Sequence, residues 1–187
     1  AGLLNDLLGR EGDRAIVDLE YLPSEQVPLL PGLKLSILDV RCREKSGALF
    51  VVEMQMLAVT GFLNRVVYNA CKAYVGTLER GAAYERLVDV VAVSICDFVL
   101  WPDAVRDAEG LPRVPMVSRW SMAEQTSGAR ALGQVQYAFL ELGKFHGQHP
   151  ETTNERWAAL FTAAPILKPE DVAHEPLTEA QREALEL

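Results

Sequence analysis

The chain has 187 residues, 49% of them hydrophobic, so it is long enough to bury one sizeable core. Its 18 basic and 26 acidic residues give a formal net charge of −8, which argues against nucleic-acid binding over the whole surface. No apolar run reaches the roughly 18 to 20 residues that a membrane helix needs. No signal peptide is recognisable, and because the chain opens without a methionine, we expect that further residues precede it.

The first elements are a helix, a strand and a loop. Residues 3–9 have helical spacing and end in a glycine, which predicts a short helix. Residues 14–22 alternate, and we expect a half-buried strand with Val17 and Tyr21 among its inward residues. The proline-rich loop that follows contains Glu25, which is either solvated or an additional acid of a functional site.

The stretch from Ser36 to Gln55 predicts an antiparallel β-hairpin with a charged turn. A three-residue loop ending at Gly47, with positive φ at that glycine, sets the register so that Asp39 faces Glu53. Because side chains alternate across a strand, Gln55 joins them on the same face. Opposed carboxylates repel each other, so a shared proton or a bound divalent cation is expected. The alternative is that both acids simply lie on the wet face of an edge hairpin.

A helix is predicted next, from a cap at Thr60 to about residue 80. Arg65, Tyr68 and Lys72 share one of its faces, which is either a solvent face or a surface that contacts phosphate. The apolar stripe expected to pack on the sheet consists of Leu63, Val66, Val67, Ala70, Tyr74 and Leu78.

The remainder of the chain adds strands and a last helix. Residues 88–98 predict a strand parallel to the second hairpin strand. Shorter strands are expected within 113–120 and 135–142, followed by a helix around Trp157 and an acidic tail from Pro169. His146 and His149 are three residues apart, but nearby glycine and proline favour a surface loop over a metal pair.

Two further patterns concern charge and cysteines. Residues 34–72 hold six basic and three acidic residues, whereas the rest of the chain holds 12 basic and 23 acidic ones. The hairpin and its helix are therefore the basic part of an acidic protein. Cys42, Cys71 and Cys96 are odd in number and widely spaced, which predicts free thiols and a reducing, cytoplasmic, bacterial-type location.

Several motifs occur together in a fixed order. They are KLSILDV at 34–40, Gly47, VEMQM at 52–56, G-F-x-x-R-x-x-Y at 61–68, G-x-x-Y at 81–84, an apolar strand at 90–95, and F-L-E-L-x-K-F at 139–145. This set resembles the PD-(D/E)XK nuclease superfamily, in particular the branch of recombination-promoting nucleases and PD-(D/E)XK family transposases. The resemblance runs from about residue 3 to residue 157.

The resemblance implies an α/β fold with a restriction-endonuclease-like core. Its mixed central sheet is flanked by helices in the order αβββαβ and carries C-terminal additions. We expect one nuclease-like domain over residues 1–165, with its N-terminal helix truncated, and an acidic tail or helix over residues 166–187.

The resemblance also implies a function, a metal-dependent endonuclease that hydrolyses DNA in transposition or recombination. Asp39 and Glu53 would bind Mg²⁺ or Mn²⁺ together with the carbonyl of Met54. Gln55 stands where the superfamily name expects lysine, and it can orient a water but carries no charge. The substrate would be contacted by Arg65, Tyr68 and Lys72.

The alternative keeps the fold and removes the chemistry, leaving an inactive or weakly active module that binds nucleic acid or a protein partner. The sequence leaves open the number of metal ions, the DNA structure that is cut, and whether two chains form a homodimer.

Overall fold

The computed structural model describes residues 1–26, 36–147 and 149–163, and the statements below concern these residues. The helices and strands are α1 (Gly2–Leu8), β1 (Leu19–Leu22), β2 (Glu25–Gln26), β3 (Ser36–Ile37), β4 (Val40–Glu44), β5 (Leu49–Gln55), α2 (Phe62–Val75), β6 (Val90–Cys96), α3 (Asp103–Ala108), β7 (Val117–Trp120), β8 (Val135–Glu141) and α4 (Thr153–Ala163). Short 3₁₀ turns cover Gly12–Arg14, Tyr84–Arg86 and Leu142–Lys144.

Six of the strands form one mixed sheet, in the order β1-β4-β5-β6-β8-β7. The three middle strands β5, β6 and β8 are parallel, and the flanking pairs are antiparallel. β2 and β3 form a separate two-stranded hairpin. The expected α/β fold with the order helix, three strands, helix, strand is confirmed by α1, β1, β4, β5, α2 and β6.

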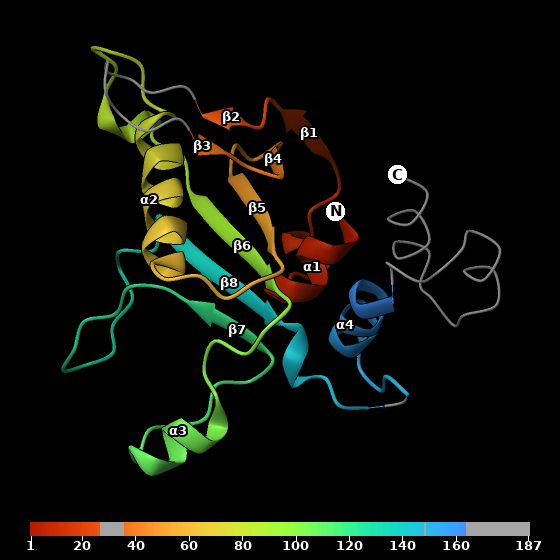
Figure 1. The fold of residues 1–187 in the computed structure, drawn as a ribbon. Coiled ribbons are helices and arrows are strands. Elements are labelled where there is room, and N and C mark those ends of the chain that lie inside the picture. The colour runs from red at the N-terminus through yellow and green to blue at the C-terminus, as the bar shows by residue number, and fades with distance from the viewer. Residues whose placement is uncertain (27–35, 148, 164–187) are drawn as a thin grey trace, which may run out of the picture.

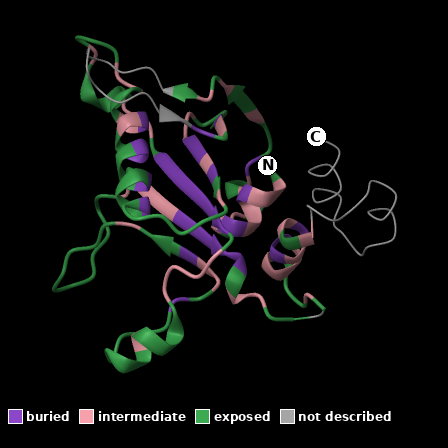
Figure 2. Ribbon diagram, in the orientation of Figure 1, coloured by how far each residue is buried: buried purple, intermediate pink, exposed green. Residues whose placement is uncertain are grey.

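The parallel strand β6 lies at the centre of the hydrophobic core. All seven of its residues are buried, as expected for an apolar run in a parallel strand that is covered on both faces. Helix α2 covers one face of the sheet, and α1 and α4 cover the other (Figure 1). The buried residues follow this layering and concentrate in the middle strands (Figure 2).

The predicted hairpin is present with the predicted register. The loop ends at Gly47, whose φ is +98°, and the amide of Glu44 donates to the carbonyl of Ala48 at 2.9 Å. Val40 then pairs with Val52, which is its partner when the pairing continues one residue at a time from Glu44 and Ala48. The first strand is shorter than predicted, however, because residues 36–37 pair with β2 and the chain bends before β4 begins.

Helix α2 differs from the prediction in its ends and its buried face. It begins after Gly61 without a side-chain cap and ends at Val75, where Gly76 and a turn closed by Thr77 replace the predicted continuation. Leu63 and Val67 were predicted to be inward but are 40% and 47% exposed. The residues that face the sheet are Phe62, Val66, Asn69, Ala70 and Ala73.

The strand prediction for residues 14–22 is wrong in extent and orientation. Only residues 19–22 form β1, and Val17 and Tyr21 are 85% and 69% exposed. Ile16 is buried instead, because the side chain of Asn5 bonds both its amide and its carbonyl. β1 is an edge strand of the sheet and pairs only with β4.

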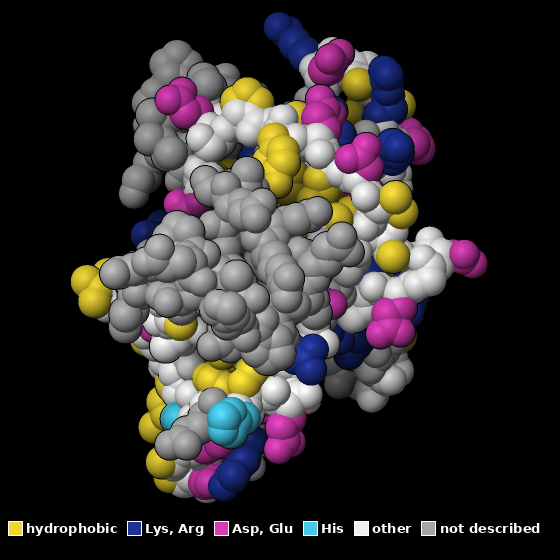
Figure 3. Space-filling view, turned by 90° about the vertical axis from the view of Figure 1, so that its right-hand side faces the viewer, with side chains coloured by type: hydrophobic (Ala, Val, Ile, Leu, Met, Phe, Trp, Pro, Cys, Tyr) yellow, Lys and Arg dark blue, Asp and Glu magenta, His cyan; other side chains and the backbone are white. Residues whose placement is uncertain are grey.

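Three further expectations can be compared with the structure. Acidic and basic side chains are interspersed on the described part of the surface in Figure 3, so that face has no single-sign patch. Within the described residues, no helix is long and apolar enough to cross a membrane.

All three cysteines are free thiols, as predicted, and burial raises the pKa of Cys42 to about 11 and of Cys96 to about 12. The tail predicted for residues 166–187 lies outside the described residues.

Candidate functional site

Asp39 lies at the bend just before β4, beside the end of β5. It is one residue outside the regular ladder, so it does not face Glu53 as a strand pair. Its carboxylate instead accepts a hydrogen bond from the main-chain amide of Met54 at 2.6 Å. The side chain is exposed, and this bond holds it at the edge of β5 next to Glu53.

Glu53 points toward α2 and is only 9% exposed. Asn69 of α2 donates to its Oε1 at 2.6 Å, and the Nε of Arg65 lies 3.9 Å from its Oε2. Burial raises the pKa of the Glu53 carboxyl, the bond from Asn69 and the charge of Arg65 lower it, and the charge of Asp39 raises it. Asp39 and Arg65 are thus the charged neighbours that act on the pKa of Glu53, in opposite directions.

Gln55 is held at both ends of its amide group. Its Oε1 accepts a hydrogen bond from Arg65, and its Nε2 donates to the carbonyl of Leu57 at 2.8 Å. Arg65 also lies over the ring of Phe62, with 5.5 Å between the guanidinium carbon and the ring centroid. The guanidinium is thus positioned by Gln55, Glu53 and an aromatic face.

The other predicted site residues lie outside this cluster. Lys72 is stacked on Tyr68, with its Nζ 6.0 Å from the ring centroid, on the exposed side of α2 beyond Arg65. Glu25 is exposed on β2, in the separate hairpin. Within the described residues, Glu25 forms no hydrogen bond with Asp39 or Glu53. Its role at the site stays a prediction.

The oxygens at the end of β5 are of the kind that hard cations prefer. Because the amide and carbonyl of one strand residue point to the same side, the carbonyl of Met54 points toward Asp39, as its amide does. Two carboxylates and one carbonyl make a donor set suited to Mg²⁺ or Mn²⁺, whose remaining positions water would fill. Among the described residues, no group of three or more His, Cys, Asp or Glu side chains gathers into a metal site.

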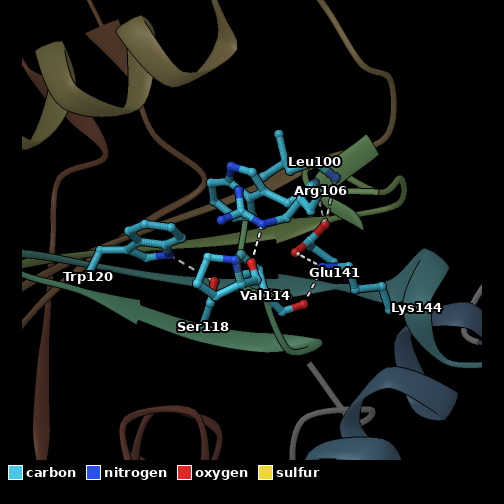
Figure 4. A network of polar contacts seen from close by, with 9 residues as sticks. Leu100, Arg106, Val114, Ser118, Trp120, Glu141 and Lys144 are labelled. Carbon is cyan, nitrogen blue, oxygen red and sulfur yellow. Dashed lines mark hydrogen bonds and ion pairs between the residues drawn. The ribbon is translucent and has the colours of Figure 1, made fainter. Parts of the chain in front are cut away.

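A buried ion pair supports the neighbouring end of the sheet (Figure 4). Glu141 is fully buried and accepts hydrogen bonds from the main-chain amides of Leu100 and Trp101 at 2.6 and 3.1 Å. It also forms an ion pair with Lys144 at 2.8 Å. Lys144 also donates to the carbonyl of Val114 at 2.6 Å. These bonds fix the loop after β6 where it enters the core.

This loop also reaches the helix that carries the site residues. Phe98 in the loop meets Phe62, the first residue of α2, edge to face with 5.7 Å between ring centroids. The ion pair of Glu141 and Lys144 therefore supports the start of α2, and through it the position of Arg65.

Two of these residues were not assigned a role from the sequence. Asn69 follows Arg65 by four residues and precedes the buried Ala70, so a polar side chain on the sheet-facing side indicated a buried partner. Glu141 was noticed only as part of a motif. Its burial could not be inferred from local spacing, because the amides of Leu100 and Trp101 that donate to it come from 41 and 40 residues earlier in the chain.

The six-stranded mixed sheet flanked by helices is consistent with a restriction-endonuclease-like fold of the PD-(D/E)XK class. The family described as PD-(D/E)XK nuclease family transposase matches residues 1–184. The chain belongs to this family. No curated protein and no solved structure matches the chain.

Proposed function

We propose that this protein is a divalent-metal-dependent endonuclease that hydrolyses phosphodiester bonds in DNA during transposition or recombination. The observation that carries the proposal is the meeting of Asp39, Glu53 and the Met54 main chain at one edge of β5, in a chain of this family. The family supports a nuclease, and the metal and the DNA substrate are our inference.

Asp39, Glu53 and the carbonyl of Met54 would hold the cation, which we infer to be Mg²⁺ or Mn²⁺. When bound, such a cation polarises the phosphoryl oxygen and lowers the pKa of an attacking water. The main-chain bond from Met54 keeps the exposed carboxylate of Asp39 in place, and Asn69 does the same for Glu53. These two bonds reduce the reorganisation that binding requires.

Arg65 would supply the positive charge that the lysine of the PD-(D/E)XK motif provides. Gln55 carries no charge, and both ends of its amide are engaged, so we assign it to positioning Arg65 rather than to orienting water. A guanidinium can contact a phosphate oxygen through its fork of donors, and its charge favours the negative charge of the transition state. Tyr68 and Lys72 would extend the contact along the substrate.

The test is cleavage of plasmid DNA by the full chain with Mn²⁺ or Mg²⁺. We expect Asp39→Ala to abolish nicking, because one carboxylate retains little of the charge that holds the ion. Asp13→Ala is the matched control, since Asp13 is exposed in a turn near the N-terminus. Cleavage at equal rates by the wild type and Asp39→Ala, or intact DNA at every pH and salt concentration, refutes the proposal.

The second candidate is an inactive module that binds nucleic acid or a partner, and the absence of lysine at position 55 favours it. Calorimetry distinguishes the two candidates. No affinity for Mg²⁺ or Mn²⁺ in the wild type, together with a more stable Asp39→Asn variant through relief of repulsion, is the result expected of the inactive module.

A further inference from the structure

Three arginines line one hollow at the other end of α2, beside the hairpin turn. Arg41 and Arg43 come from β4, and Arg86 comes from the segment between α2 and β6. The hollow has a volume of about 430 Å³, and Gly47 and residues 76–79 form much of its remaining wall. Glu79 is the one acidic residue in this lining, so the hollow is basic in an otherwise acidic protein.

Within the described residues, neither Arg41 nor Arg86 forms an ion pair. The Nε atom of Arg41 is buried and, within the described residues, has no hydrogen-bond partner. A buried donor without an acceptor is costly and calls for an explanation. Arg43 has Glu20 4.0 Å away, but both side chains are largely exposed, so this pair contributes little.

A second hollow lined by arginines shows the contrast. Arg10 there pairs with Glu44 at 3.0 Å, and Arg119 donates its Nε–H to the carbonyl of Leu7 at 2.7 Å. Those two cations are satisfied by the protein itself. The buried donor of Arg41 is not, so an anion supplied from outside is the partner that its chemistry calls for.

Phosphate oxygens, like carboxylate oxygens, match the fork of donors of a guanidinium group. The position of the hollow indicates which phosphate it takes. Arg41 follows Asp39 by two residues, a distance of about 6.6–6.8 Å along a strand. It pairs with Val51, which faces α2 as Glu53 does, so the arginines continue from the carboxylates along the same side of the hairpin.

We propose that Arg41, Arg43 and Arg86 form a phosphate-binding site that holds a backbone phosphate of the nucleic-acid substrate, beside the bond addressed by Asp39 and Glu53. The identity of the ligand as nucleic acid rests on the proposed nuclease function. Binding of a phosphate group to the hollow does not.

The first experiment titrates the full chain with inorganic phosphate, and with chloride at the same ionic strength. Nuclear magnetic resonance follows the Nε–H signal of Arg41, assigned by its disappearance in Arg41→Gln. We expect a saturable shift with phosphate, no shift with chloride, and a weaker response in Arg86→Gln. Arg14→Gln is the charge-matched control, since Arg14 is exposed and distant from the hollow lining. Equal responses to the two anions overturn the site.

The second experiment measures binding of a DNA duplex, without divalent metal, at several salt concentrations. Each phosphate contact contributes about 0.9 to the slope of log K against log salt concentration. We expect Arg41→Gln and Arg86→Gln each to reduce the magnitude of that slope by about 0.9, and Arg14→Gln to leave it unchanged. Arg86 is exposed, so its variant tests the site without a risk to the core.

The two experiments separate the possible failures. A specific phosphate shift with unchanged DNA slopes overturns the assignment to nucleic acid and points to a free phosphate compound. Reduced slopes together with cleavage that survives Asp39→Ala support the phosphate site and refute the proposed catalytic centre. No shift and no change of slope overturn the inference itself.

Discussion

Asn69 is predicted to be the residue of α2 on which the candidate site depends most. It is 4% exposed and donates to the buried carboxylate of Glu53 at 2.6 Å. A hydrogen bond to a charged group contributes about 1.5–3 kcal/mol, and the small loss of packing in Asn69→Ala adds to it. We expect the variant to lose about 2–3 kcal/mol of unfolding free energy at pH 7.5, which corresponds to a fall in Tm of about 4–12 °C.

The loss should depend on pH with a definite sign. Burial raises the pKa of Glu53 and the Asn69 bond opposes that rise, so the variant raises the pKa further. When a group has a higher pKa in the folded than in the unfolded state, the protein loses stability as the pH rises through the pKa of the folded state. The gap between wild type and Asn69→Ala should therefore widen as the pH rises from 4 to 8.

Urea unfolding of four proteins forms the assay: the wild type, Asn69→Ala, Glu53→Gln and the double variant. We expect a coupling energy of about 1–2 kcal/mol between the two sites at pH 7.5. Asn64→Ala, an exposed asparagine on the same helix, should change stability by less than about 0.5 kcal/mol. A coupling energy near zero, or equal costs for Asn69→Ala and Asn64→Ala, refutes the reasoning.

Three further predictions concern Gln55, the buried ion pair and the cysteines. Gln55→Lys removes the acceptor that positions Arg65 but brings its own cation to the same place, so it should preserve or raise plasmid cleavage while weakening Mn²⁺ affinity in calorimetry; unchanged affinity would contradict this. Lys144→Met leaves Glu141 buried without its cation and should cost about 3–5 kcal/mol in urea unfolding, so a near-neutral variant would be evidence against the buried pair. Thiol labelling of the native protein at pH 8 should modify Cys71 alone, because the other two thiols are buried; mass spectrometry that finds three modified cysteines contradicts the burial.

The turn and the strand register of the hairpin could be predicted from the sequence. Gly47 after two polar residues specifies the turn, and the turn fixes the register of β4 against β5. The apolar run of β6 specifies a strand buried on both faces. The turn and the register depend on neighbours close in the chain, which is why the pairing of β4 with β5 was predictable.

The side chains that complete the site depend on tertiary structure. The bend at Asp39 follows from the pairing of β3 with β2, and that pairing moves its carboxylate from a ladder position to the amide of Met54. Nothing in the local spacing indicates such a shift. The final position of the first predicted ligand was therefore set by a neighbouring hairpin.

The rotation of α2 was decided in the same way. Apolar periodicity alone predicts Leu63 and Val67 toward the sheet, yet the helix turns Asn69 inward and leaves those two in solvent. A carboxylate buried on β5 needs a donor, and only a side chain from the facing helix can supply it. The sequence by itself determined the hairpin turn, the register of β4 against β5 and the buried run of β6, because these follow from local pattern, and its set of motifs indicated the class of fold. The orientation of the helix brings Asn69 to Glu53 together with the buried apolar residues of α2, and these contacts exist only once the sheet and the helix have come together.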